Sequence, residues 1–136
     1  RVAENHPQHW VLGSDQSAAL DGDALGKPGD IAGAHAQLAR CSGREVVFYT
    51  AAVLLRGEAL LQTLDVTTVR FRVLDTDAIA RYVAAEPALD CAGSFKCEAY
   101  GIALFEAIET RDPTALIGLP LIATAQLLRQ AGWTLP

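Results

Sequence analysis

Three short segments carry residue types suited to nucleotide polyphosphate chemistry: 13–16 (GSDQ), 26–28 (GKP) and 90–101 (DCAGSFKCEAYG). The small residues of the third segment allow a ligand to approach the backbone, whose N–H groups can bind an anion. Lys96 adds a positive charge suited to phosphate, and Glu98 adds an acceptor able to read the donor-rich edge of a base. Alone, such a loop is more often a tight turn than a site. Together, the three segments predict a nucleotide polyphosphate site.

In this order, the segments resemble those of the Maf family of nucleoside triphosphate pyrophosphatases, also called septum formation inhibitor-like proteins. They are most similar to the branch that hydrolyses 7-methyl-GTP. The resemblance runs from about Val11 to Arg129 and includes Asp112-Pro113 and 116–121 (LIGLPL), with Ala99 where the branch usually has glycine. The family opens with a strand, a Ser/Arg-rich phosphate loop, a helix and an acidic segment that are not in this sequence. We therefore expect residues 1–136 to form a single Maf-like domain, truncated at the N-terminus relative to the family.

The resemblance implies a role for each candidate residue. Asp15 would be the proton acceptor that activates water for attack at the α-phosphate, and would also bind a divalent metal, Mg²⁺ or Mn²⁺. Lys27 and Lys96 would face the polyphosphate and offset charge in the transition state. Gln16 and Glu98 would set substrate specificity, with the Glu98 carboxylate accepting hydrogen bonds from a guanine edge. Each residue also has a plain structural interpretation, as a turn acceptor or a solvated side chain.

Composition narrows the classes of protein that this chain can be. With 136 residues, 51% of them hydrophobic, it can form one domain with a core. Eleven basic and 16 acidic residues give a net charge of −5, which argues against a nucleic-acid polymer as partner. No apolar run approaches the roughly 18 residues of a membrane span. Three cysteines without Cys-x-x-Cys spacing argue against disulfides and zinc, and favour a reducing cytoplasm.

The strands that would position the candidate residues follow from hydrophobic patterning. We expect a short strand over 9–14 that ends at a small-residue corner, followed by a hairpin turn at 21–23 (DGD). Residues 45–55 and 60–73 are rich in Val, Phe, Tyr and Thr and predict two long strands. A further strand is expected over 102–108, after the glycine-containing segment.

Three helices are expected between and after these strands. Asp30 is a plausible N-cap for a helix through about Arg40, and Asp75 or Thr76 for a second through about Glu86. A C-terminal helix should open at Thr114 with an irregular first turn, because glycine and proline follow closely. This order predicts a mixed α/β fold with a largely antiparallel sheet. The resemblance further implies a strongly curved sheet flanked by helices, like that of inosine triphosphate pyrophosphatases.

These observations favour a cytoplasmic enzyme that converts 7-methyl-GTP, or a related modified nucleotide, to the monophosphate and pyrophosphate. The alternative is a catalytically silent nucleotide-binding or regulatory module linked to cell division. A serine hydrolase is disfavoured, because Ser14 lies in no Gly-x-Ser-x-Gly motif and has no evident histidine partner. The expected partner is a nucleoside triphosphate, without nucleic acid or membrane. A homodimer is allowed, through apolar surface that the absent segment would leave uncovered.

Overall fold

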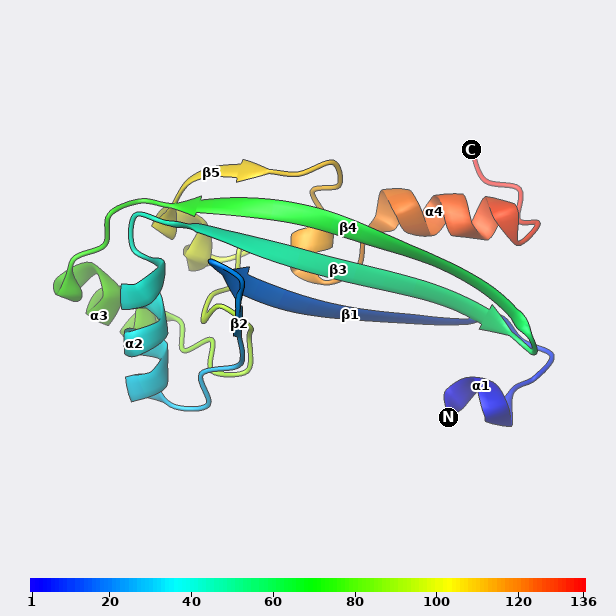
Figure 1. Cartoon of the computed structure of the whole chain (residues 1–136), viewed down its shortest axis with the longest axis horizontal. Helices are drawn as coiled ribbons and strands as arrows, with labels where there is room; N and C mark the ends of the chain where they lie inside the picture. Colours follow the sequence, from blue (N-terminus) through cyan, green and yellow to red (C-terminus); the bar gives the residue numbers. More distant parts are fainter.

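The structure, a computed structural model, describes residues 1–136. Its five strands form one sheet in the order β2-β1-β3-β4-β5, and every neighbouring pair is antiparallel (Figure 1). The strands are β1 (Val11–Leu20), β2 (Asp23–Leu25), β3 (Glu45–Arg56), β4 (Ala59–Phe71) and β5 (Phe105–Glu109). The helices are α1 (Val2–Asn5), α2 (Ile31–Cys41), α3 (Thr76–Ala85) and α4 (Leu121–Gln130), with 3₁₀ turns η1 (Tyr100–Leu104) and η2 (Ala115–Ile117).

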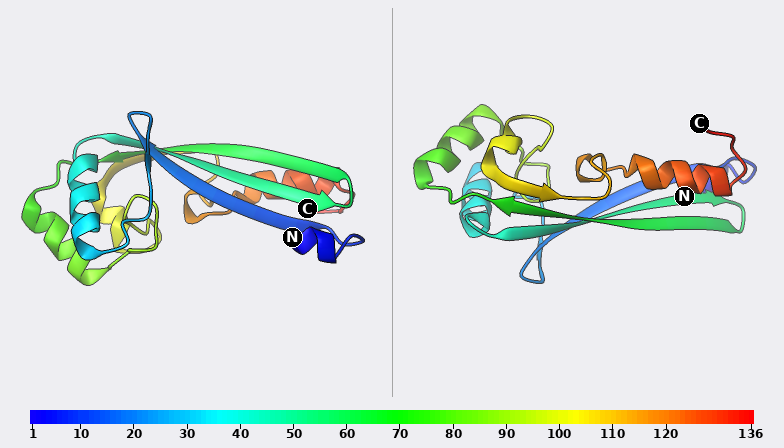
Figure 2. Two further views of the ribbon diagram at one scale, coloured as in Figure 1. Left: turned by 60° about the horizontal axis from the view of Figure 1, so that its bottom comes forward. Right: turned by 90° about the horizontal axis from the view of Figure 1, so that it is seen from above.

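The long strands β1, β3 and β4 make an elongated, twisted ribbon that gives the molecule its shape (Figure 2). Helices α2 and α3 lie at one end of this ribbon, whereas α4 runs beside its other half (Figure 1). The predicted mixed α/β class with a largely antiparallel, curved sheet is confirmed, and the sheet does not close into a barrel. None of the helices has the length and apolar character that a membrane span requires.

Buried and more exposed side chains alternate along β3, so one face of the sheet lies against a core. Val46, Phe48, Thr50, Ala52 and Leu54 are all buried, as the period of two predicts for a strand with one face against a core. The opposite face of the ribbon carries large exposed side chains: Tyr49, Leu60, Leu64 and Val66.

Both predicted aspartate caps are confirmed. The Asp30 carboxylate accepts from the Gly33 N–H at 2.6 Å, and Asp75 accepts from the Ala78 N–H at 2.7 Å. Each bond satisfies one of the backbone donors that the first turn of a helix leaves free. Helix α2 ends at Cys41, close to the predicted position.

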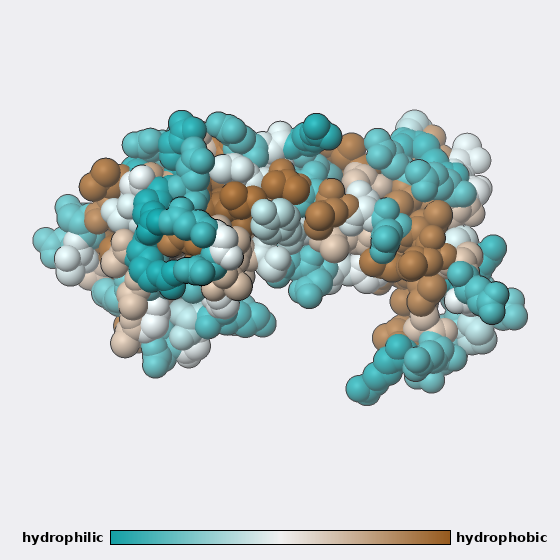
Figure 3. All heavy atoms as spheres, viewed as in Figure 1, coloured by the Kyte–Doolittle hydropathy of each residue, from teal (hydrophilic) through white to brown (hydrophobic).

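Two apolar cores lie along the covered face. The larger one, between the sheet and α2, α3 and the loops, contains a cluster of four phenylalanines with centroids 4.8–5.6 Å apart: Phe48, Phe71, Phe95 and Phe105. The smaller core joins α4 to the ribbon through Ala52, Leu54 and Leu127. Figure 3 shows apolar atoms gathered at that end of the molecule, between α1 and α4.

The first predicted strand was too short. Residues 13–16 are not a corner but lie within β1, where Asp15 pairs with Ala51 of β3 in a regular register. The glycine and serine suggested a turn, but long-range pairing with β3 keeps this segment extended.

The predictions after residue 100 were also partly wrong. Residues 100–104 form η1 rather than a strand, and β5 begins only at Phe105. A Cβ at Gly101 would collide with the Lys96 backbone, so this turn packs against the preceding loop instead of extending. The expected C-terminal helix opens irregularly, as predicted: η2 comes first, and α4 starts at Leu121, beyond Gly118 and Pro120.

Candidate active site

All five residues predicted from the sequence to form the site line one cavity of about 300 Å³, called here the site cavity. They come from three separate segments: Asp15 and Gln16 from β1, Lys27 from the loop after β2, and Lys96 and Glu98 from the loop before η1. The remaining lining residues are Ser14, Phe48, Asp90, Cys91, Ala92, Phe95, Cys97, Leu116, Ile117 and Gly118. The fold therefore brings the predicted residues together, whatever the role of each.

Asp15 lies where β1 has an open edge. Strand β2 pairs only with Ala18–Leu20, so no strand pairs with the outer edge of β1 beside Asp15. Its Oδ1 accepts from the Gln16 N–H at 2.9 Å, and its other oxygen has no hydrogen bond within the chain. An exposed carboxylate with one free oxygen can accept a proton from water or bind a cation.

Gln16 is held firmly by the turn that lines the cavity. Its Nε2 lies 2.9 Å from Ala115 O, 3.3 Å from Leu116 O and 2.9 Å from Thr50 Oγ1. Because an amide nitrogen has only two protons, these acceptors occupy it fully. Gln16 therefore fixes η2 against the sheet and leaves only its Oε1 for a ligand.

Ser14 supports the same region from the neighbouring position. Its Oγ lies 2.6 Å from Gly118 O and 2.8 Å from Ala51 O, and its single proton is donated to one of them at a time. Gly118 has φ of +125°, which disfavours a side chain at this bend. The wall formed by η2 is thus tied to β1 at two points.

Sequence reasoning missed Gln37, which connects the two loops that carry the lysines. From α2, its Nε2 donates to Gly26 O at 3.0 Å, and its Oε1 accepts from Ser94 Oγ at 2.5 Å. Gly26 precedes Lys27, and Ser94 lies two residues before Lys96. No local signal could identify Gln37, because its partners are 11 and 57 residues away in the chain.

The loop that carries Lys96 has a tightly determined backbone. Ser94 is buried with φ of +64°, a conformation unusual for a residue other than glycine. The Lys96 N–H donates to the Tyr82 hydroxyl at 3.1 Å, and the Lys96 backbone packs against Gly101. These contacts define where the Lys96 side chain starts, although the residue lies outside any helix or strand.

The two thiols of the site cavity stay protonated at neutral pH. Burial raises the pKa of Cys97 to about 11, helped by the hydrogen bond to Glu98. Burial and the neighbouring Asp90 carboxylate also raise the pKa of Cys91. Since the thiolate is the nucleophilic form, neither cysteine is suited to nucleophilic catalysis.

The charged groups of the site cavity do not balance a triphosphate by themselves. Two lysines face three carboxylates, those of Asp15, Asp90 and Glu98. Nowhere in the chain do three His, Cys, Asp or Glu side chains converge as a ready metal cage. Mg²⁺ commonly binds through one or two carboxylates together with substrate phosphates and water. The free oxygen of Asp15 fits that manner of binding.

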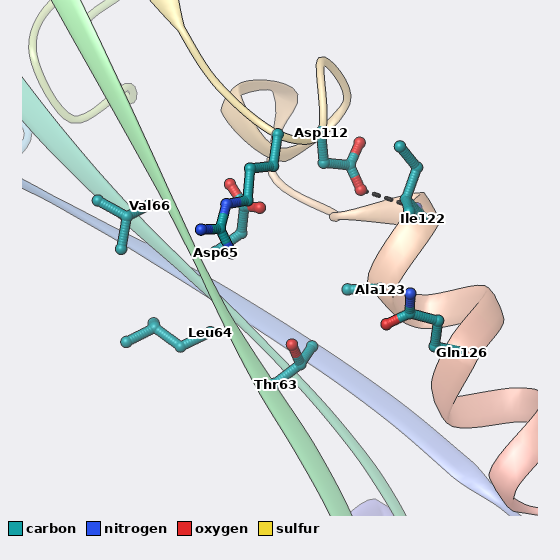
Figure 4. A pocket seen from close by; sticks show the side chains of 9 residues that line it. Thr63, Leu64, Asp65, Val66, Asp112, Ile122, Ala123 and Gln126 are labelled. Atoms are coloured by element: carbon teal, nitrogen blue, oxygen red, sulfur yellow. Dashed lines mark hydrogen bonds between the residues drawn. The ribbon is translucent and has the colours of Figure 1, made fainter.

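A second cavity, called here the α4 cavity, is larger, at about 480 Å³, and shares no lining residue with the site cavity. It lies between β4, which contributes Thr63 to Val66, and the start of α4 (Figure 4). Asp112 points at the first turn of α4, where its Oδ2 accepts from the Ile122 N–H at 2.7 Å. Its Oδ1 accepts from both the N–H and the hydroxyl of Thr114. This carboxylate is thus occupied in holding the helix.

The antiparallel sheet flanked by helices, with two lysines and a carboxylate at one cavity, agrees with the family that the sequence resembles. The chain matches the model of the family described as Maf-like protein over residues 1–131, and it belongs to the Maf family. It is 60% identical over 136 residues to a protein of Xanthomonas campestris pv. campestris (strain 8004) named 7-methyl-GTP pyrophosphatase. That match covers 99% of this chain and 71% of the relative.

Two further relatives carry the same name. The protein of Xanthomonas oryzae pv. oryzae (strain MAFF 311018) is 61% identical over 135 residues, covering 99% of this chain and 71% of the relative. The protein of Aromatoleum aromaticum (strain DSM 19018 / LMG 30748 / EbN1) is 49% identical over 138 residues, with the same coverage. The resemblance found in the sequence is therefore confirmed.

Proposed function

We propose that this protein hydrolyses 7-methyl-GTP, or a closely related modified nucleoside triphosphate, to the monophosphate and pyrophosphate. The observation that carries the proposal is the convergence of Asp15, Lys27, Lys96 and Glu98 on one cavity from three separate segments. The names of the relatives, at 60% and 61% identity over nearly the whole chain, support the same reaction. More broadly, these names support a hydrolase that acts on nucleoside triphosphates.

Asp15 acts as the general base in this reaction. Its free oxygen takes a proton from a water molecule while the water oxygen attacks the α-phosphorus. The bond between the α-phosphorus and the α–β bridging oxygen then breaks, and pyrophosphate leaves with the electron pair. Lys27 and Lys96 neutralise the negative charge that grows on the phosphate oxygens during this step. Gln37 holds the two loops that carry these lysines in a fixed position relative to each other.

A divalent cation, Mg²⁺ or Mn²⁺, completes the proposed site. Asp15 would hold it jointly with the phosphates, because the cavity offers no separate cage of protein ligands. When bound, the ion supplies the positive charge that two lysines cannot provide against a triphosphate of about four negative charges. The lysines still decide where the phosphates lie.

Specificity rests on Glu98 and Gln16 in different ways. The exposed Glu98 carboxylate can accept hydrogen bonds from a guanine edge, and its charge favours the positive ring of a 7-methylated base. Gln16 acts mainly through the position of η2, because its amide nitrogen is already bonded there. The alternative, a silent nucleotide-binding or regulatory module, would bind the same nucleotides without turnover.

The test is a pyrophosphate-release assay with a panel of triphosphates, run with Mg²⁺ or Mn²⁺ in ¹⁸O-labelled water. We expect 7-methyl-GTP to give the highest kcat/KM, with the label entering the monophosphate and not the pyrophosphate. Binding without turnover of any triphosphate, at every metal concentration, would favour the silent module. Label in the pyrophosphate would mean attack at the β-phosphate and contradict the role given to Asp15.

We further propose that residues 1–136 act as one Maf-like domain in the cytoplasm and associate as a homodimer. The uncovered ribbon face supports association, because Leu60 and Leu64 are 54% and 60% exposed there. Light scattering after size-exclusion chromatography measures the mass directly. A monomer at all concentrations would remove the dimer from this proposal without affecting the chemistry.

A further inference from the structure

A third cavity, of about 370 Å³, adjoins the site cavity and is called here the apolar cavity. The two share four lining residues: Cys97, Glu98, Leu116 and Ile117. The apolar cavity is otherwise lined by Ile102, Ile108, Thr110 and Pro113. One ligand could therefore extend from the site cavity into the apolar cavity past the side chain of Glu98.

The two cavities differ sharply in charge. Both lysines line the site cavity, whereas the apolar cavity contains no cation, and Glu98 is its single charged residue. Thr110 offers little further polarity, because its hydroxyl donates to Asp112 O at 2.8 Å and lies 2.9 Å from Thr67 Oγ1. Phosphate is thus favoured on one side of Glu98, and an apolar or cationic group on the other.

The Glu98 side chain, which lines both cavities, is also held in place by a neighbouring residue. The Cys97 thiol donates to Glu98 Oε2, with an Sγ–O distance of 3.5 Å, and leaves the other carboxylate oxygen free. The raised pKa of Cys97 keeps this thiol protonated, and therefore a donor, throughout the neutral range. One oxygen is positioned by the protein while the other can meet a ligand.

We propose that the apolar cavity binds the base of the nucleotide, and that Ile102, Ile108 and Ile117 are the specificity residues that surround it. A 7-methylated guanine suits this cavity, because the methyl group leaves a positive charge on an otherwise apolar ring. The absence of any lysine or arginine from the lining favours that charge, and Glu98 adds an attractive partner. The proposal rests on the proposed function, and it adds where the base lies and why a cationic base is preferred.

The test places a charge in the apolar cavity and compares two substrates that differ mainly in ring charge. Ile102 is 53% exposed, so Ile102→Lys and Ile102→Glu should both fold. Because the triphosphates of 7-methyl-GTP and GTP are alike, the ratio of their kcat/KM values isolates the effect on the base. We expect Ile102→Lys to lower this ratio about fivefold or more, and Ile102→Glu to raise it.

The matched control is Ile31→Lys, because Ile31 is 58% exposed at the start of α2 and lines neither cavity. It adds the same charge to the chain and should leave the ratio within about twofold of wild type. Equal ratios in the wild type and both Ile102 variants would overturn the proposal. A ratio that shifts as much in the control would also overturn it, since the effect would then come from net charge.

Binding separates this proposal from the proposed function. Calorimetric titration with 7-methyl-GMP and GMP, and separately with inorganic tripolyphosphate, needs no turnover. We expect Ile102→Lys to weaken 7-methyl-GMP more than GMP, and to leave tripolyphosphate binding no weaker. If the wild type binds 7-methyl-GMP in this manner but releases no pyrophosphate, the base cavity stands and the proposed reaction fails. Equal weakening of 7-methyl-GMP and GMP binding would contradict the base cavity.

Discussion

The site cavity and the α4 cavity differ in what their charged groups do for the fold. In the α4 cavity, which is the larger, both oxygens of Asp112 accept hydrogen bonds, one from Thr114 and the other from the first turn of α4. In the site cavity, Lys27 and Lys96 form no ion pair within the chain, and Asp15 keeps one oxygen free. Arg111 in the α4 cavity also has no ion pair, so the two cavities differ in the use of Asp112 for the fold and in the two unpaired lysines that the site cavity brings together.

The largest predicted effect is the loss of turnover when the carboxylate of Asp15 is removed. Asp15→Asn should lower kcat for 7-methyl-GTP by about 100-fold or more, because an amide cannot accept the proton. Asp15 is exposed, so the free energy of unfolding should change by less than about 0.5 kcal/mol. Steady-state kinetics and urea denaturation measure the two effects. Near-normal turnover would exclude Asp15 as the base.

The opposite result is expected in the α4 cavity. Asp112→Ala should lower the free energy of unfolding by about 2 kcal/mol, because three donors, those of Thr114 and Ile122, lose their acceptor. The folded fraction should keep kcat within about threefold of wild type. Glu58→Ala, which removes an exposed carboxylate from the β3–β4 turn, is the control and should change stability by less than about 0.5 kcal/mol. A loss of turnover without a loss of stability in Asp112→Ala would reverse the comparison.

The same carboxylate should make stability depend on pH. Burial acts to raise the pKa of Asp112, but hydrogen bonds from Thr114, Ile122 and Ala123 outweigh it and lower the pKa below its ordinary value of 3.8. A lowered folded-state pKa contributes stability that is present above about pH 4 and is lost as the pH falls through the folded-state value. Below about pH 4, the wild type should therefore lose stability more steeply than Asp112→Ala, as measured by urea denaturation across pH. Parallel pH curves for the two proteins would contradict this assignment.

A smaller effect is expected from the residue that links the lysine loops. Gln37→Leu removes the bonds to Gly26 and Ser94 and should lower kcat/KM about tenfold through misplaced lysines. Gln126→Leu makes the same change at a glutamine that lines the α4 cavity, and it should leave kcat/KM within about twofold of wild type. Equal kinetics for the two variants would show that Gln37 does not position the site.

The smallest predicted change concerns the substrate preference. Glu98→Gln replaces a charge-assisted contact with a neutral one and should lower kcat/KM for 7-methyl-GTP about fivefold relative to pyrimidine triphosphates. The comparison of substrates within one variant removes any general loss of activity. Glu58→Gln removes an exposed carboxylate outside the site cavity and should leave the ratio unchanged. An unchanged ratio in Glu98→Gln would mean that this residue does not contact the base.

Local signals were sufficient for much of the fold. The Asp21–Asp23 hairpin turn, the caps at Asp30 and Asp75, and the two long alternating strands depend on neighbouring residues, and all are present. The length of β1 was missed because its pairing partners in β3 lie 28 to 44 residues later in the chain. The turn η1 was missed because it depends on close packing of Gly101 against Lys96.

The same difference between local and long-range signals applies to the candidate site. Asp15, Lys27, Lys96 and Glu98 could be selected by residue type and motif, and the fold brings them to one cavity. Gln37 could not be selected, because a glutamine on a helix surface has no distinctive local pattern. The bonds of Gln16 to η2 were also hidden, since Ala115 is 99 residues away. The motifs identified residues that line the site cavity, but not the long-range contacts that hold its walls in place.

The most direct test is a crystal structure with a 7-methyl-GTP analogue in which a methylene group replaces the α–β bridging oxygen. The account predicts the phosphates beside Lys27 and Lys96, with the α-phosphate next to the free oxygen of Asp15. It also predicts an empty α4 cavity. Density for the triphosphate in the α4 cavity beside Arg111, with the site cavity vacant, would contradict the account.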